Sequence, residues 1–128
     1  LLMVAECENE VNGGPTTLAY QCINAVRQRA GIAVLAGLNQ EDFRTAVKNE
    51  RAMELCFEMT RRFDLIRWGE FKVNMNALVA RAKNGSNWTL GPSNVYTYFQ
   101  VSDTYNYFPI PSNEMSVNKA IKDNNPGW

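Results

Sequence analysis

The stretch from Asn39 to Arg62 constrains the fold of this 128-residue chain more than any other, because a helical apolar pattern there carries a dense run of charges. Asn39 is a favourable N-cap residue, and Glu41 and Asp42 place negative charge in the first turn, where the helix dipole favours it. We expect a helix from Asn39 through about Met59. Its expected inward stripe consists of apolar residues at helical spacing: Phe43, Ala46, Val47, Met53, Cys56 and Phe57.

The charges within this stretch predict a buried ion-pair network. Glu50 and Glu54 lie four residues apart and therefore share one helix face. Counted from the apolar stripe, position 50 faces inward, and a buried carboxylate is costly unless it is paired. The candidate partners are four arginines close in sequence: Arg51, Arg61, Arg62 and Arg67. Two carboxylates could also be the acid and base of a glycosidase. Arginine neighbours favour ionised carboxylates, however, which suits ion pairing better than proton donation.

Residues 1–31 predict a helical hairpin. Residues 1–11 form the first expected helix, which stops at Asn12-Gly13-Gly14. Pro15 suits the first position of a second helix that runs to about Ala30, and Gly31 follows where a C-cap glycine belongs. Such a hairpin is the unit from which helical-repeat proteins are stacked, so its inner face needs neighbours. The expected inward positions are Leu1, Val4, Ala5, Glu8 and Val11 in the first helix, and Leu18, Cys22, Ala25 or Val26, and Arg29 in the second.

The rest of the chain combines short helices with an irregular, aromatic segment. Residues 63–68 suit a helical turn closed by Gly69, and residues 70–83 suit another helix. A short strand is expected from Val95 to Val101 within the turn-rich part. The run Phe-Pro-Ile-Pro at 108–111 should be extended, because proline biases the residue before it away from the α conformation. Residues 112–115 can form one helical turn. The predicted fold class is therefore all-α, with a long irregular aromatic loop and an extended C-terminal tail.

The aromatic segment holds the candidate ligand-binding residues. Flat aromatic faces stack on sugar rings, and tyrosine adds a hydroxyl group for hydrogen bonding. The candidates are Trp88, Tyr96, Tyr98, Tyr105 and Tyr107. The segment has few other large apolar residues, so packing of the ring against the helices is the favoured interpretation for any one of these five.

Composition excludes several classes of function. With 13 basic and 13 acidic residues the formal net charge is zero, which argues against a general surface for nucleic acid or anionic membranes. The absence of histidine excludes an imidazole base or ligand within the chain. The three cysteines lie far apart, and we expect small core residues rather than metal or redox groups. Phosphate-binding glycine loops and the GxSxG and HExxH motifs are absent. We therefore expect no metal, no cofactor and no catalytic residue.

Two separate motifs carry a family resemblance. The run from Asn49 to Gly69 contains the groups Asn-Glu-Arg, Phe-Glu, Arg-Arg-Phe-Asp-Leu and Arg-Trp-Gly, and the ending from Phe108 to Trp128 contains Phe-Pro-Ile-Pro followed by Asn-Asn-Pro-Gly-Trp. These motifs resemble the hallmark segment and the usual C-terminus of the SusD/RagB-type outer-membrane nutrient-binding lipoproteins. The first hairpin looks like their last one. One departure is Met59-Thr60, where many relatives have a Gly-His-like pair.

The resemblance implies a function that composition alone does not. Members are lipid-anchored on the outer face of the outer membrane, where they bind glycans or other nutrients for a TonB-dependent (SusC-like) transporter and do not catalyse. Their fold is an all-α scaffold with tetratricopeptide-like helical hairpins. Residues 1–128 would be the C-terminal part of such a domain, with the N-terminal part and the lipidated cysteine outside the chain. We expect no signal peptide in these residues, whose opening Leu-Leu-Met-Val-Ala-Glu reads as the middle of a helix. No family-wide binding residue maps onto this chain.

Two other functions are open alternatives. A helical-repeat adaptor that binds protein partners would also use hairpins, but it leaves the aromatic segment and the Phe-Pro-Ile-Pro tail unexplained. A carbohydrate-active enzyme would use Glu50 and Glu54 as its acid and base, and it is the least favoured interpretation because of the neighbouring arginines.

Overall fold

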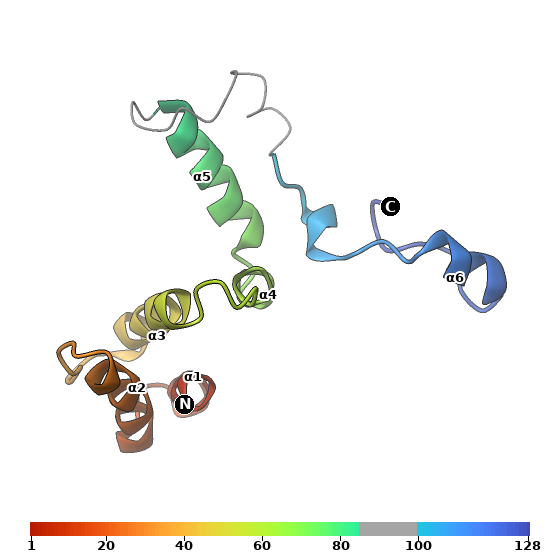
Figure 1. The fold of residues 1–128 in the computed structure, drawn as a ribbon. Coiled ribbons are helices and arrows are strands. Elements are labelled where there is room, and N and C mark those ends of the chain that lie inside the picture. The colour runs from red at the N-terminus through yellow and green to blue at the C-terminus, as the bar shows by residue number, and fades with distance from the viewer. Residues whose placement is uncertain (85–99) are drawn as a thin grey trace. The chain divides into compact units, whose positions relative to one another are not determined.

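The computed structural model describes residues 1–84 and 100–128, which form two compact units, residues 1–61 and 62–128 (Figure 1). In chain order the helices are α1 (Leu2–Val11), α2 (Thr17–Arg29), α3 (Gln40–Glu54), α4 (Arg61–Arg67), α5 (Phe71–Asn84), the 3-10 helix η2 (Asp103–Asn106) and α6 (Ser112–Val117). The described residues contain helices and no strand, which confirms the all-α prediction. The expected strand at 95–101 falls almost entirely outside the described residues, and the two described positions, 100 and 101, are not in a strand.

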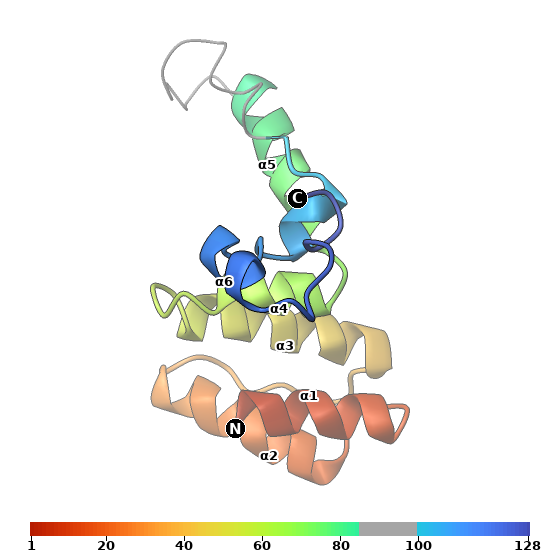
Figure 2. The same ribbon diagram turned by 90° about the vertical axis from the view of Figure 1, so that its right-hand side faces the viewer.

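The first unit is built from the predicted hairpin and the helix that packs on it. Helices α1 and α2 lie side by side, and α3 lies along them in Figure 2. Their buried apolar side chains form one cluster: Leu2, Ala5, Ala19, Cys22, Ile23, Val26, Phe43 and Val47. The ring of Tyr20 meets the ring of Phe43 edge-on, with centroids 5.1 Å apart. Alanines 5 and 19 are fully buried, so small side chains sit where the helices meet most closely.

The hairpin is confirmed, and the faces predicted for its two helices are right in part: Ala5, Cys22 and Val26 are buried as expected. In α1 the buried positions also include Leu2 and Asn9, whereas Leu1, Val4 and Val11 are exposed. In α2, Leu18 is exposed and Ile23 is buried. The predicted helix start is also wrong: the Thr16 side chain accepts a hydrogen bond from the backbone N–H of Ala19 (3.2 Å), so Thr16 is the N-cap and Pro15 precedes the helix instead of opening it.

In the segment between α2 and α3, side chains make the hydrogen bonds to the backbone that a neighbouring β-strand would otherwise make. The Asn24 amide donates to the carbonyl of Leu35 (2.9 Å) and accepts from its N–H (2.8 Å). The Tyr20 hydroxyl accepts from the N–H of Leu38 (2.7 Å). The segment then ends at the predicted N-cap, since the Asn39 side chain accepts from the N–H of Asp42 (2.9 Å). Three side chains thus satisfy backbone groups that have no sheet to pair with.

Replacing Asn24 with aspartate should destabilise the protein by about 1–3 kcal/mol, because a carboxylate cannot donate to the carbonyl of Leu35 and leaves it unpaired. Urea unfolding followed by circular dichroism measures the change. Gln28→Ala, at an exposed position of the same helix, is the control and should shift stability by less than about 0.5 kcal/mol. Equal stability of the aspartate variant and the wild type would contradict the proposed role of the amide.

Helix α3 ends at Glu54, about five residues before the predicted end near Met59. The reason is backbone conformation: Phe57 (φ 67°) and Met59 (φ 58°) are left-handed, which an α-helix cannot continue through. Phe57, predicted to face inward, is consequently 98% exposed. Met53 lies within α3, and its predicted inward position is wrong as well, at 61% exposure. The expectation of buried cysteines holds for Cys22 alone, because Cys7 and Cys56 are exposed.

The second unit carries the tail that the sequence predicted to be extended. The Asn124 amide accepts from the N–H of Ile110 (2.7 Å) and donates to its carbonyl (3.3 Å), while Asn125 donates to the carbonyl of Phe108 (2.6 Å). Asn76 of α5 holds Val101 in the same two-bond manner (2.9 and 3.1 Å). Side-chain amides therefore hold extended backbone in both units, in place of strand pairing.

Candidate functional site

The inward carboxylate predicted from the sequence is present and paired. Glu50 is 3% exposed, and it accepts a hydrogen bond from Nη1 of Arg27 in α2 at 2.7 Å. The Nε–H of Arg27 donates to the carbonyl of Ala33, also at 2.7 Å. One guanidinium thus joins α3 to α2 and to the segment that follows α2. Because both side chains of this ion pair are largely removed from water, each depends on the other for charge compensation.

The second predicted carboxylate, Glu54, pairs with Arg29, again from α2. Arg51, near Glu54 in the same helix, is buried, with 7% of its surface exposed. Neither Arg27 nor Arg29 was among the arginines expected from sequence, since both lie more than twenty residues away along the chain. Their placement at the end of α2 was the available signal: Arg29 was among the predicted inward positions of that helix, but Arg27 was not. Both members of the suggested acid–base pair are therefore held in ion pairs, an arrangement that suits structural support.

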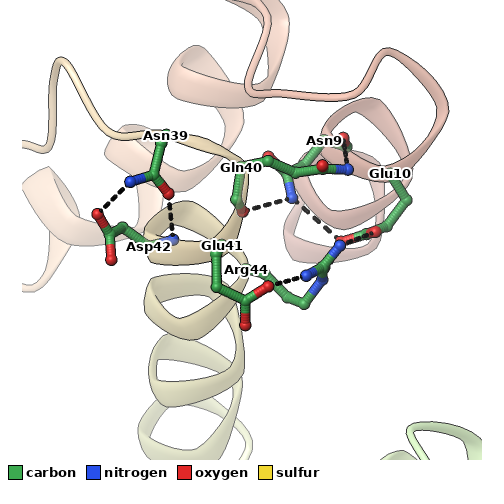
Figure 3. A network of polar contacts seen from close by, with 7 residues as sticks. All are labelled: Asn9, Glu10, Asn39, Gln40, Glu41, Asp42 and Arg44. Atoms are coloured by element: carbon green, nitrogen blue, oxygen red, sulfur yellow. Dashed lines mark hydrogen bonds and ion pairs between the residues drawn. The ribbon is translucent and has the colours of Figure 1, made fainter.

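A second polar network joins α1 to the start of α3 (Figure 3). The guanidinium of Arg44 donates to both oxygens of Glu10 (2.7 and 2.6 Å) and also contacts Glu41. Beside it Asn9, which is fully buried, donates to the carbonyl of Gln40 (3.1 Å), and the Gln40 side chain donates to the carbonyl of Asn9 (3.2 Å). The Arg44 hydrogen bonds are the largest cause of a lowered pKa at Glu10. The same pairing raises the pKa of Arg44, so this ion pair persists at neutral pH.

Acidification should remove the contribution of Glu10 to stability. Its pKa in the folded protein lies below the ordinary value of 4.5, so its contribution is fully present above that value and is lost as pH falls through the folded pKa. Urea unfolding between pH 7 and pH 3 should therefore show a modest decrease in the free energy of unfolding as the pH falls. This decrease should be smaller in Glu10→Gln than in the wild type. Glu58→Gln, in an exposed loop, is the matched control. Identical pH profiles for Glu10→Gln and wild type would contradict the assignment.

The remaining predicted arginines lie at α4. Arg62 places its guanidinium 4.1 Å from the ring centroid of Phe108 and 5.5 Å from that of Phe71, and donates to the carbonyl of Tyr105 (2.8 Å). Arg67 pairs with the buried carboxylate of Asp64 (3.0 Å). Arg61 is exposed and donates to the carbonyl of Lys48 at 3.4 Å. The contacts of Arg62 hold the C-terminal tail against the helices of its own unit.

Two of the five aromatic candidates, Tyr105 and Tyr107, lie within the described residues, at 44% and 53% exposure. Tyr105 meets the ring of Trp128 edge-on, with centroids 6.0 Å apart, and Trp128 is itself 49% exposed. The other three candidates, Trp88, Tyr96 and Tyr98, lie outside the described residues. The structure thus brings Tyr105 together with an aromatic residue that was not among the candidates.

Residues 1–84 and 100–128 contain neither a candidate metal site nor a candidate membrane-spanning helix. No group of three or more cysteine or acidic side chains could hold a metal ion there. Among the helices in this part of the chain, none has the length and apolar character to cross a membrane.

Comparison with known proteins gives one consistent result. The sequence matches the profile of the SusD family over residues 1–128. Two SusD-like proteins of Formosa agariphila are similar: one is 40% identical over 124 residues, covering 94% of this chain and 21% of the relative, and the other is 28% identical, covering 100% and 24%. The crystal structure of a SusD homologue from Bacteroides thetaiotaomicron superposes with a TM-score of 0.85 at 34% identity, covering 99% of this chain and 25% of that one. The chain therefore spans between a fifth and a quarter of the length of these relatives.

Proposed function

The chain belongs to the SusD family, and we propose that the protein of which it is part binds a glycan or another nutrient at the cell surface and delivers it to a TonB-dependent, SusC-like transporter. The family's general role is nutrient and glycan binding. The observation that carries the proposal is the match of the whole chain, in sequence and in fold, to this family. An outer-membrane location, through a lipid anchor outside these residues, belongs to the same proposal.

We further propose that residues 1–128 act as scaffold, as the C-terminal part of a helical domain with tetratricopeptide-like hairpins. The ion pairs of Glu50 and Glu54 with α2 support this role, because they engage both carboxylates in holding helices together. The protein would then bind its ligand without cleaving it. Ligand contacts from this part of the chain would come from its exposed aromatic residues, for which Tyr105 and Tyr107 are the described candidates.

The test uses the full-length protein. A glycan array followed by isothermal titration calorimetry should identify a soluble oligosaccharide that binds saturably. Affinity isolation from detergent-solubilised outer membranes should recover a TonB-dependent transporter with the protein. Absence of any glycan or nutrient ligand, together with isolation of the protein without a transporter, would overturn the proposal. Recovery of a soluble protein partner instead would favour the helical-repeat adaptor.

A further inference from the structure

Three side chains of α2 bind the backbone of the segment that follows the helix, residues 32–38, which we call the strap. The contacts pair Arg27 with Ala33, Asn24 with Leu35, and Tyr20 with Leu38. Because the order along the strap is the reverse of the order along α2, the strap runs antiparallel to the helix. Within residues 1–84 and 100–128, residues 33–38 make no hydrogen bond from backbone to backbone. The strap is therefore held by these side chains and by the packing of two leucines, Leu35 and Leu38, on the apolar cluster.

Arg27 differs from the other two side chains because its guanidinium also binds α3. Its Nη1 donates to the carboxylate of Glu50 at 2.7 Å, and its Nε–H donates to the carbonyl of Ala33 at 2.7 Å. The guanidinium is planar and its N–H groups point in fixed directions, so the bond to Glu50 also sets the direction of the Nε–H. Without the carboxylate, the long side chain regains its rotamer freedom and can carry its charge towards water. One carboxylate of α3 thus positions a donor that holds the strap.

We propose that Arg27 couples the strap to α3, so that the strap lies closed along α2 only while Glu50 holds the guanidinium. The strap opens when the charge pair is lost or α3 shifts. The opening leaves the helices packed, because the buried apolar cluster of the first unit contains no residue of the strap. Local openings of this kind have a lower free energy than unfolding of the whole unit. The strap is then an element with two positions whose equilibrium depends on α3. This inference is independent of the proposed transport function.

Hydrogen exchange of the full-length protein, resolved by peptide mass spectrometry, measures how often the strap opens. In Arg27→Lys the amides of residues 33–38 should exchange about tenfold faster or more than in the wild type. The reason is that lysine keeps the charge opposite Glu50 but lacks the planar fork that reaches Ala33 at the same time. Gln28→Lys, at an exposed neighbouring position, is the control and should change the rate by less than about twofold. An unchanged rate in Arg27→Lys, or wild-type exchange as fast as in an unfolded peptide, overturns the proposal.

A second comparison tests whether Glu50 acts on the strap through Arg27. Glu50→Gln should raise the exchange rate of residues 33–38 by about tenfold or more in the wild-type background. Added to Arg27→Lys, the same change should alter that rate by less than about twofold, because the strap is already released. Equal effects in the two backgrounds overturn the coupling, since the carboxylate would then act by another route. If Glu50→Gln does not fold, the comparison of Arg27→Lys with the wild type decides.

Discussion

Glu50→Ala should destabilise the protein by about 3–5 kcal/mol, because it leaves the guanidinium of Arg27 largely buried without its counter-charge. The loss combines the broken ion pair with the cost of a desolvated cation. It should appear as a lower midpoint in urea at an unchanged slope. Glu41→Ala in the same helix is the matched control: its side chain is 72% exposed, and its loss should cost less than about 1 kcal/mol.

Replacing both members of the pair separates the loss of the ion pair from the cost of leaving a buried cation unpaired. Removing Arg27 together with Glu50, as Glu50→Leu with Arg27→Met, replaces the pair with apolar side chains and should recover much of the stability lost in Glu50→Ala. A double variant as unstable as the sum of the two single variants would contradict the interpretation of Glu50 as a paired structural charge. It would instead assign each side chain a separate role.

Gly127→Ala should destabilise the second unit by about 2–5 kcal/mol. Position 127 has φ 90°, which strains any residue with a Cβ atom, and the new Cβ would lie 2.3 Å from Oγ1 of Thr104. Thermal unfolding measures the loss. Gly37→Ala is the matched control, because it is also left-handed (φ 67°) but has open space around its Cβ position, so it should lose only about 1–2 kcal/mol.

A second-site change distinguishes the clash from the strain at position 127. Thr104→Ala removes Oγ1 and Cγ2, the two atoms nearest to the Cβ that alanine would add, and should restore part of the stability of Gly127→Ala. If the double variant is as unstable as Gly127→Ala, the contact of position 127 with Thr104 of η2 does not explain the need for glycine. The backbone conformation would then account for the whole effect.

Local features of this fold could be predicted from the sequence, and long-range ones could not. The cap at Asn39 and the glycine at position 31 (φ 71°) follow from rules that involve only a few neighbouring residues. The inward position of Glu50 follows from helical spacing. The predicted end of α3 was wrong, because the apolar spacing continues to Phe57 while the backbone there turns left-handed.

The partners of the predicted residues were harder to foresee, for a physical reason. Arg27 reaches Glu50 across 23 positions of sequence, and Asn76 reaches Val101 across 25. Which side chain faces another at that separation depends on how the helices pack, and the positions predicted to face inward in α2 did not include Arg27. The hydrogen bonds between asparagine side chains and the backbone produce no periodic pattern in the sequence, because each asparagine pairs with the N–H and C=O groups of a single extended residue. The pairing of Tyr105 with Trp128 likewise depends on the path of the tail.

We propose that Glu50 and Glu54 have a structural role in a protein that binds its ligand without cleaving it. The most direct test incubates the full-length protein with the oligosaccharide that it binds, and follows binding by calorimetry and cleavage by chromatography of the products. We expect saturable binding with the oligosaccharide recovered intact. Release of shorter products by the wild-type protein, abolished in folded Glu50→Gln or Glu54→Gln, would contradict this claim.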